Sequence, residues 1–64
     1  MAPSEFDILE RHDDGSFVWV ESTQDLPAAQ ARLLALSIES PGEYFVFDKK
    51  TQQFVVSRST RPTN

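Results

Sequence analysis

The residues best suited to chemistry stand in one short polar run near the start of the chain, His12-Asp13-Asp14. A histidine beside carboxylates could bind a divalent metal ion or act as a general base. The same run, followed by Gly15, is also what a tight hairpin turn prefers. Because a lone histidine in an exposed turn lacks the surrounding side chains that orient a ligand or a base, we interpret the run as a turn. We predict no catalytic residue, no metal ligand and no cofactor.

Three other carboxylates, Asp7, Glu10 and Glu21, lie on predicted neighbouring strands and could form an acid–base pair. Nothing in their spacing indicates a shared pocket, so we expect them at solvated strand edges, where charge discourages edge pairing. The serines have no nucleophile-elbow context, and a second histidine for a relay is missing. The only glycines, Gly15 and Gly42, form no phosphate-binding loop. The sequence therefore predicts a protein that is not an enzyme.

Length and composition predict one small domain that needs help to stay folded. A chain of 64 residues buries only about 60% of its unfolded surface. It has no cysteine, so neither disulfides nor thiolate metal sites can stabilise it, and association is the usual remaining aid. We expect a cytoplasmic protein without a membrane partner. The sequence has no cysteine, no secretory signal and no apolar run long enough to span a bilayer.

The net charge of −4 is unevenly distributed. Residues 1–31 hold seven acids against one arginine, whereas residues 32–64 hold five basic residues against three acids. An acidic chain without a basic stripe is poorly suited to a phosphate backbone, so we expect no nucleic-acid partner. The opposed halves could steer a partner or a second copy of the chain.

A first hairpin is predicted around the turn, with strands over residues 6–11 and 16–21. A three-residue loop, 13–15, of a type I turn plus a bulge pairs Ile8 with Val20 and Leu9 with Trp19. A two-residue turn would shift this register. One face then carries Phe6, Ile8, Val18 and Val20, and the other carries Leu9, Phe17 and Trp19.

A helix is predicted over residues 26–39, which are rich in alanine and leucine. Asp25 is a suitable N-cap, Pro27 is tolerated in the first turn, and Pro41-Gly42 ends the helix. Its apolar residues form two stripes at helical spacing. The first stripe is Leu26, Ala29, Leu33 and Leu36, and the second is Ala31, Leu34 and Ile38.

A second hairpin is predicted over residues 43–57, where aromatic and β-branched runs flank a polar turn at 48–52. If Asp48 pairs with Gln53, both faces of this hairpin are apolar. One face carries Phe45, Phe47, Phe54 and Val56, and the other carries Tyr44, Val46 and Val55.

These elements predict an α+β fold in the order ββαββ. Two hairpins join into a four-stranded, largely antiparallel sheet with the helix on one face. The strand order and the face that the helix covers stay open. We expect a single domain over residues 1–57, and a disordered polar tail over residues 58–64. Since one helix covers one face only, the other face should present an apolar patch.

Parts of the chain resemble small, uncharacterised, single-domain bacterial proteins of about this length. The resemblance rests on Asp14-Gly15-Ser16-Phe17-Val18-Trp19-Val20-Glu21, on the alanine- and leucine-rich helix, and on Ser40-Pro41-Gly42-Glu43-Tyr44-Phe45-Val46-Phe47-Asp48. It covers roughly residues 6–56 and carries over no activity and no catalytic residue. This chain has Gln52 after Thr51, where glycine is the more ordinary turn residue.

The aromatic residues could stack nucleic-acid bases on the sheet, but such platforms need basic residues around them. Packing or an interface therefore explains the aromatic residues better. We expect a non-enzymatic interaction module that self-associates as a homodimer through an aromatic sheet face. The alternative is a peptide- or protein-binding adaptor that uses the same face or a sheet edge. The candidate interface residues are Phe17, Trp19, Leu34, Ile38, Phe45, Phe47 and Phe54.

Overall fold

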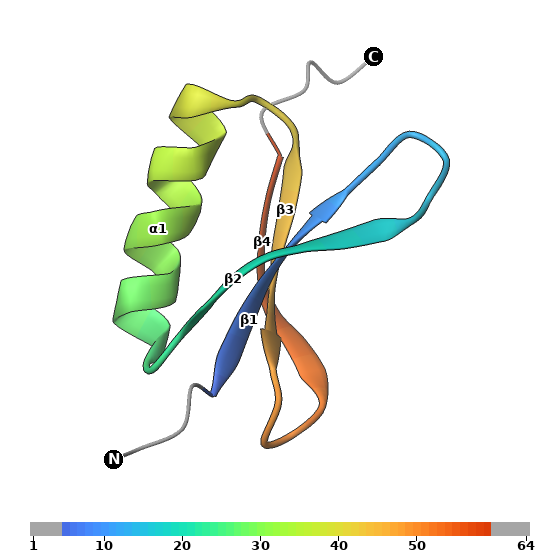
Figure 1. The fold of residues 1–64 in the computed structure, drawn as a ribbon. Helices are drawn as coiled ribbons and strands as arrows, with labels where there is room; N and C mark the ends of the chain where they lie inside the picture. The colour runs from blue at the N-terminus through green and yellow to red at the C-terminus, as the bar shows by residue number, and fades with distance from the viewer. Residues whose placement is uncertain (1–4, 60–64) are drawn as a thin grey trace.

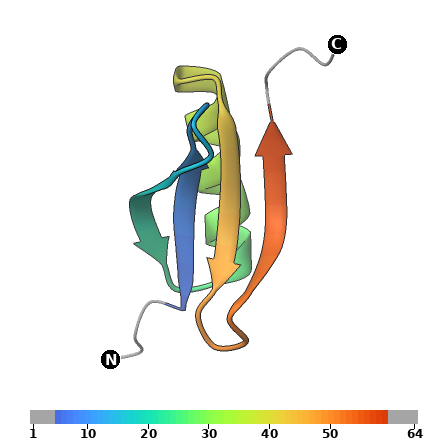
Figure 2. The ribbon, with the colours of Figure 1, turned by 90° about the vertical axis from the view of Figure 1, so that its right-hand side faces the viewer.

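Four strands form one antiparallel sheet in the computed structural model, which describes residues 5–59 (Figure 1). The elements in chain order are β1 Phe6–Arg11, β2 Phe17–Thr23, α1 Leu26–Glu39, β3 Glu43–Asp48 and β4 Gln53–Ser59. Their order across the sheet is β2-β1-β3-β4, so the two hairpins meet along β1 and β3 (Figure 2). This confirms the predicted α+β fold in the order ββαββ.

The helix α1 has the predicted bounds because its end signals are local. The carboxylate of Asp25 accepts a hydrogen bond of 2.8 Å from the backbone N–H of Ala28, as an N-cap should. At the other end the N–H of Ser40 donates to the carbonyl of Leu36. The hydroxyl of Tyr44 donates to the carbonyl of Ser40, which ties the first residues of β3 to the end of α1.

The helix covers the sheet face that carries Tyr44 and Val46, which answers the question that the sequence left open. The fully buried apolar residues are Ile8, Ala29, Leu33, Tyr44 and Val46. Partly buried residues that pack against them are Phe6, Val20, Leu26, Leu36 and Val56. The first predicted helix stripe therefore faces the core.

The first hairpin has the predicted loop but a different register beyond it. Gly15 has a φ of 86°, and the N–H of Gly15 donates to the carbonyl of His12 at 2.9 Å. Leu9 pairs with Trp19, as expected. The pairing of Ile8 with Val20 is wrong, because a β-bulge shifts the register and Ile8 pairs with Glu21.

The second hairpin also contains a β-bulge that the sequence did not reveal. Asp48 pairs with Gln53 and Phe47 with Phe54, as expected. Val46 then pairs with Val56, so Val55 is the extra residue. The predicted faces of these two valines are therefore wrong: Val56 packs against the core, whereas Val55 is exposed.

The strand β4 runs to Ser59, so Arg58 and Ser59 belong to the sheet and not to the predicted tail. The rest of that tail, residues 60–64, lies outside the described residues. Arg58 also contacts the helix, because its Nε donates to the hydroxyl of Ser37 at 3.1 Å. No helix in the described part of the chain is long and apolar enough to cross a membrane.

Candidate functional site

Four phenylalanine rings pack together on the sheet face opposite α1, which we name the open face. Phe54 lies at their centre, with ring centroids 5.3 Å from Phe47, 5.6 Å from Phe45 and 5.6 Å from Phe17. Phe17 also meets Phe45 edge to face at 5.4 Å. We name Phe17, Phe45, Phe47 and Phe54 the aromatic cluster. Its spacings fall within the range in which aromatic pairs attract one another.

The curvature of the sheet brings this cluster together. Phe17 belongs to β2 and Phe54 to β4, the two opposite edge strands, yet their rings stack. The hairpin of β1 and β2 leans away from α1 toward the open side of the sheet (Figure 1). Strand twist, increased by the bulges on β2 and β4, makes such a diagonal contact possible.

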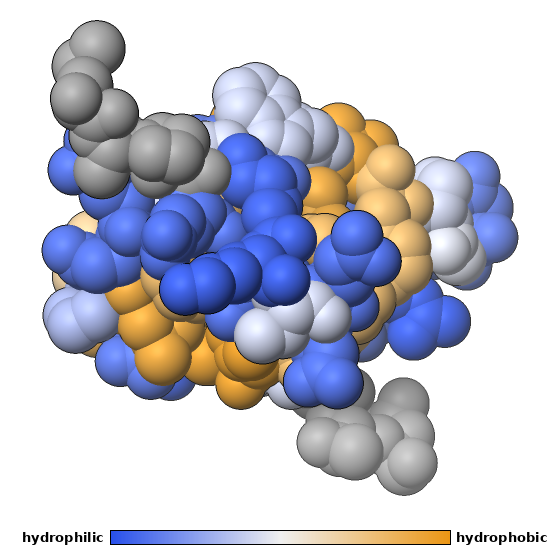
Figure 3. Space-filling model, turned by 90° about the horizontal axis from the view of Figure 1, so that it is seen from below, coloured by the Kyte–Doolittle hydropathy of each residue, from blue (hydrophilic) through white to orange (hydrophobic). Residues whose placement is uncertain are grey.

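Much of the open face remains in contact with solvent. Phe17 is 45% exposed, Phe54 is 52% exposed and Trp19 is 59% exposed, while Phe45 and Phe47 are half-buried. Seen from below, hydrophobic side chains reach the surface on the open side of the sheet and also on the side of the helix (Figure 3). The aromatic cluster is thus a second packed group, and no element within residues 5–59 covers it.

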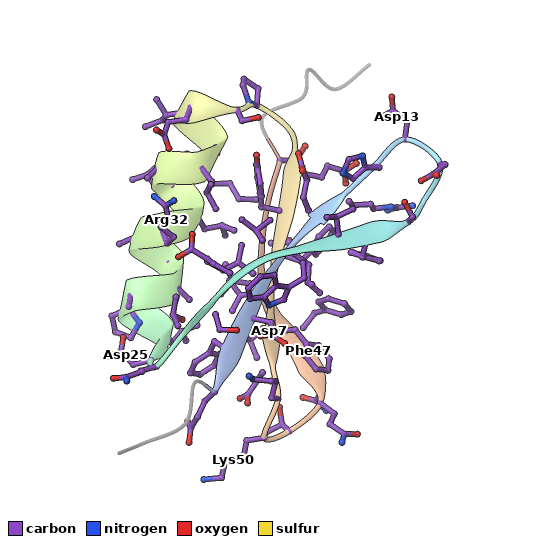
Figure 4. All side chains as sticks on the ribbon, viewed as in Figure 1. Asp7, Asp13, Asp25, Arg32, Phe47 and Lys50 are labelled. Carbon is purple, nitrogen blue, oxygen red and sulfur yellow. The ribbon has the colours of Figure 1, made fainter. Side chains whose placement is uncertain are left out.

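A carboxylate orients the indole beside this cluster. The Oδ1 atom of Asp7 accepts hydrogen bonds from Trp19 Nε1 at 3.3 Å and from the hydroxyl of Ser22 at 2.6 Å. Lys49 Nζ lies 3.5 Å from the same oxygen. Partial burial acts to raise the pKa of Asp7, but the hydrogen bonds from Ser22 and Trp19 and the charge of Lys49 together lower it. Asp7 lies beside Phe47 in the middle of the sheet (Figure 4).

The structure divides the seven predicted interface residues between two surfaces. Phe17, Trp19, Phe45, Phe47 and Phe54 lie together on the open face. Leu34 and Ile38 lie on α1, which packs on the other side of the sheet, and they are 45% and 72% exposed. Their stripe points away from the core, so it is a separate apolar surface.

The residues considered for chemistry do not converge. Asp7 lies on the open face, whereas Glu21 forms an ion pair with Arg32 of the helix on the other side. Glu10 lies 3.4 Å from His12, and Asp14 accepts hydrogen bonds from the backbone and hydroxyl of Ser16, which lower its pKa. Within residues 5–59 the structure contains no pocket and no group of three or more His, Asp or Glu residues that could hold a metal ion.

Asp7 is the member of this surface that sequence reasoning missed. The alternation of side chains along β1 could have revealed this role, because it places Asp7 and Leu9 on the same face of the sheet. On the neighbouring strand β2, Asp7 pairs with Ser22 and Leu9 pairs with Trp19. We read Asp7 as a solvated strand-edge acid, but the hydrogen bond to Trp19 makes it part of the open face.

The fold and this surface define a class of molecule: a small α+β domain with a helix on one sheet face and aromatic residues on the other. Comparisons of the chain with protein-family models, with curated proteins and with solved structures give no match. Functional inference therefore rests on the open face itself.

Proposed function

We propose that the protein is a small non-enzymatic interaction module that self-associates as a homodimer through its open face. The observation that supports this proposal is the aromatic cluster, a set of contacting rings of which Phe17 and Phe54 remain about half exposed. Buried aromatic residues are enriched at the centres of protein interfaces, and Trp19 stands beside the cluster with its indole already oriented by Asp7.

The energy available from covering these rings is at least as large as the cost of association. Aromatic side chains bury about 150–250 Å², so each half-exposed ring of Phe17, Trp19 and Phe54 leaves on the order of 100 Å² in water. At about 25 cal/mol per Å² this is roughly 2.5 kcal/mol per ring, or about 15 kcal/mol for six rings in two copies. Association costs about 4–15 kcal/mol. The difference is about 0–11 kcal/mol. A value near the middle of this range, about 5.5–8.2 kcal/mol, corresponds to a dissociation constant on the order of 1–100 µM, and we expect a concentration-dependent dimer of that affinity.

The edges of the sheet are less suited to a second copy than its open face. Both edge strands, β2 and β4, contain a β-bulge, at Val20 and at Val55. A bulge interrupts the regular row of backbone donors and acceptors that edge-to-edge pairing needs, and it twists the edge away. This favours stacking of two open faces over extension of the sheet.

Sedimentation equilibrium across concentrations of about 1 µM to 1 mM tests the proposal. We expect the mass to rise from the 7.3 kDa of one chain toward twice that value. Phe54→Ser should shift the dissociation constant upward at least about tenfold, because each copy loses a half-exposed ring from the interface. Ile38→Ser is the matched control: Ile38 is the most exposed large apolar residue described, but it lies on α1.

The proposal is wrong if the wild-type protein stays at 7.3 kDa throughout, or if Ile38→Ser dissociates it as strongly as Phe54→Ser. The monomer of 7.3 kDa could instead form a stable complex with a different protein. If Trp19→Ser abolishes that complex, the protein is a peptide- or protein-binding adaptor.

We place this module in the cytoplasm as part of the same proposal. Its support is the lack of cysteine in all 64 residues, which suits a reducing compartment. Fractionation of cells that produce the tagged chain checks the location, and recovery in an exported fraction would contradict it.

A further inference from the structure

Charged side chains beside the aromatic cluster stand next to charges of opposite sign from the same chain. Asp7 alternates onto the open face with Leu9, and its Oδ1 atom lies 3.5 Å from Nζ of Lys49 in the β3–β4 turn. Arg11 follows on the same face of β1, directly opposite Glu43 of β3. Opposite charges at directly paired positions attract one another. These four charges cancel, so the net charge of −4 is carried by the rest of the chain.

Other charges near the open face belong to its rim. Glu5, which precedes β1, and Lys50 of the β3–β4 turn add one charge of each sign. The Asp48 carboxylate points into its own turn, where it accepts hydrogen bonds from two backbone N–H groups. Asp13 and Asp14 lie in the β1–β2 turn, and Asp13 and Lys50 stand at opposite ends of the sheet (Figure 4). Charges at the rim of an interface stay in contact with water and contribute little to its affinity.

The Asp7–Lys49 pair, in contrast, lies where a cover would remove water from it. Asp7 pairs with Phe47 of the aromatic cluster, and the side chains of Asp7 and Lys49 are 20% and 42% exposed. Removing water from a charge is costly unless an opposite charge stays beside it. Asp7 keeps Lys49 beside it, and it also accepts the hydrogen bonds of Trp19 and Ser22. The polar groups at this place are therefore matched before anything covers them.

We infer that the Asp7–Lys49 ion pair lies inside the self-association interface, where each charge is matched by its own chain and not by the other copy. This inference rests on the proposed self-association and identifies residues that determine its specificity. A partner that presents an unmatched charge to this surface is disfavoured. The open face of a second copy is suited to it, because there the charges beside the cluster are matched in the same way.

An internally matched pair has a characteristic response to substitution. Loss of one member leaves the other charge under the cover, where it has lost water and also lost its attraction. Replacement of both members by neutral groups removes the cost together with the attraction, and is close to neutral. The two single changes at Asp7 and Lys49 should therefore weaken the dimer more than the two changes combined.

Sedimentation equilibrium of single and double variants tests this inference. Asp7→Asn keeps an oxygen acceptor for Trp19 and Ser22 but leaves the Lys49 ammonium unpaired, and it should raise the dissociation constant at least about fivefold. Lys49→Gln removes the counter-charge of Asp7 and should raise the constant by a similar factor. The double variant Asp7→Asn/Lys49→Gln should return to within about twofold of the wild type. Circular dichroism at the same concentrations checks that each variant is folded.

Glu39→Gln and Lys50→Gln are matched controls, because they make the same changes in net charge as Asp7→Asn and Lys49→Gln. Glu39 is the exposed last residue of α1, and Lys50 is the exposed neighbour of Lys49 in the turn. Each control should change the dissociation constant less than about twofold.

The inference is overturned if the single variants at Asp7 and Lys49 behave like their controls, since the pair then lies outside the interface. It is also overturned if the double variant is weakened as much as both single changes together, because the charges then contact the other copy and not each other. If Phe54→Ser still dissociates the dimer in either case, the proposed function stands. A wild-type protein that stays monomeric overturns both.

Discussion

Asp7 shows how one carboxylate can serve both the fold and the surface. Its Oδ1 atom accepts hydrogen bonds from the indole of Trp19 and the hydroxyl of Ser22, and it forms an ion pair with the ammonium of Lys49. These three groups come from two different parts of the chain. Charged hydrogen bonds of this kind contribute more than neutral ones. The side chain that appeared to be an ordinary strand-edge acid thus holds the tryptophan of the open face in one orientation.

Asp7→Asn should lower the free energy of unfolding by roughly 1 kcal/mol near neutral pH, because the charged acceptor is lost. The pKa of Asp7 is lowered in the folded protein, so its contribution is complete above the unfolded pKa of about 4 and is lost as the pH falls below that value. Denaturant unfolding of both proteins at one fixed concentration, from about pH 7 to pH 2, checks this. A difference that does not shrink in acid would contradict the assigned role.

Gln52 is the one described residue other than glycine with a positive φ, at 61°. This left-handed conformation costs a residue with a Cβ atom about 1–2 kcal/mol, although it lets the N–H of Gln52 donate to the carbonyl of Asp48. Gln52→Gly removes that strain but raises the conformational entropy of the unfolded chain, which offsets part of the gain. We expect a net stabilisation of about 0.5–1 kcal/mol in thermal or denaturant unfolding. Gln53→Gly, in the adjoining strand, should destabilise instead.

At the scale of single elements, the sequence predicted what local signals determine. The bounds of α1 follow from Asp25, Pro27 and the Pro41-Gly42 break, all of which act within a few residues. The bulges at Val20 and Val55 were not predicted, because they depend on how two strands twist together and not on residue type alone.

The two faces of α1 make opposite predictions for neighbouring residues. Leu33 is 2% exposed and packs in the core, so Leu33→Ala should lower the free energy of unfolding by roughly 2–5 kcal/mol. Leu34→Ala removes the same atoms from a 45% exposed position and should cost less than about 1 kcal/mol. Urea denaturation of the two variants measures both. Similar losses would show that the outer stripe of α1 is covered in solution.

At the scale of the whole molecule, the class of fold was predictable but the choice of faces was not. Alternation along the second hairpin made both of its faces apolar, and sequence gives no way to weigh one against the other. The structure places Tyr44 under the helix, where its hydroxyl donates to the carbonyl of Ser40, and leaves Phe45, Phe47 and Phe54 on the open face. The strand order β2-β1-β3-β4 likewise depends on a contact between distant parts of the chain.

The candidate surface was predicted in part for the same reason. Aromatic residues on β2, β3 and β4 meet because the sheet is curved. The sequence pattern predicted that they share a face but did not predict that their rings contact one another. Leu34 and Ile38 were predicted as interface residues because they are apolar and belong to the second helix stripe, which the core does not need. Once α1 is placed across the sheet, they belong to a different side of the molecule.

The position of the only tryptophan has an optical consequence. Trp19 is 59% exposed in the single chain, its ring lies on the open face, and its Nε1 atom is held by Asp7. Indole emission moves to shorter wavelength when water is removed from the ring, and mass action makes that removal depend on concentration. Intrinsic fluorescence therefore reports directly on whether the open face is covered: the emission maximum should shift to the red on dilution, with no label attached to the chain.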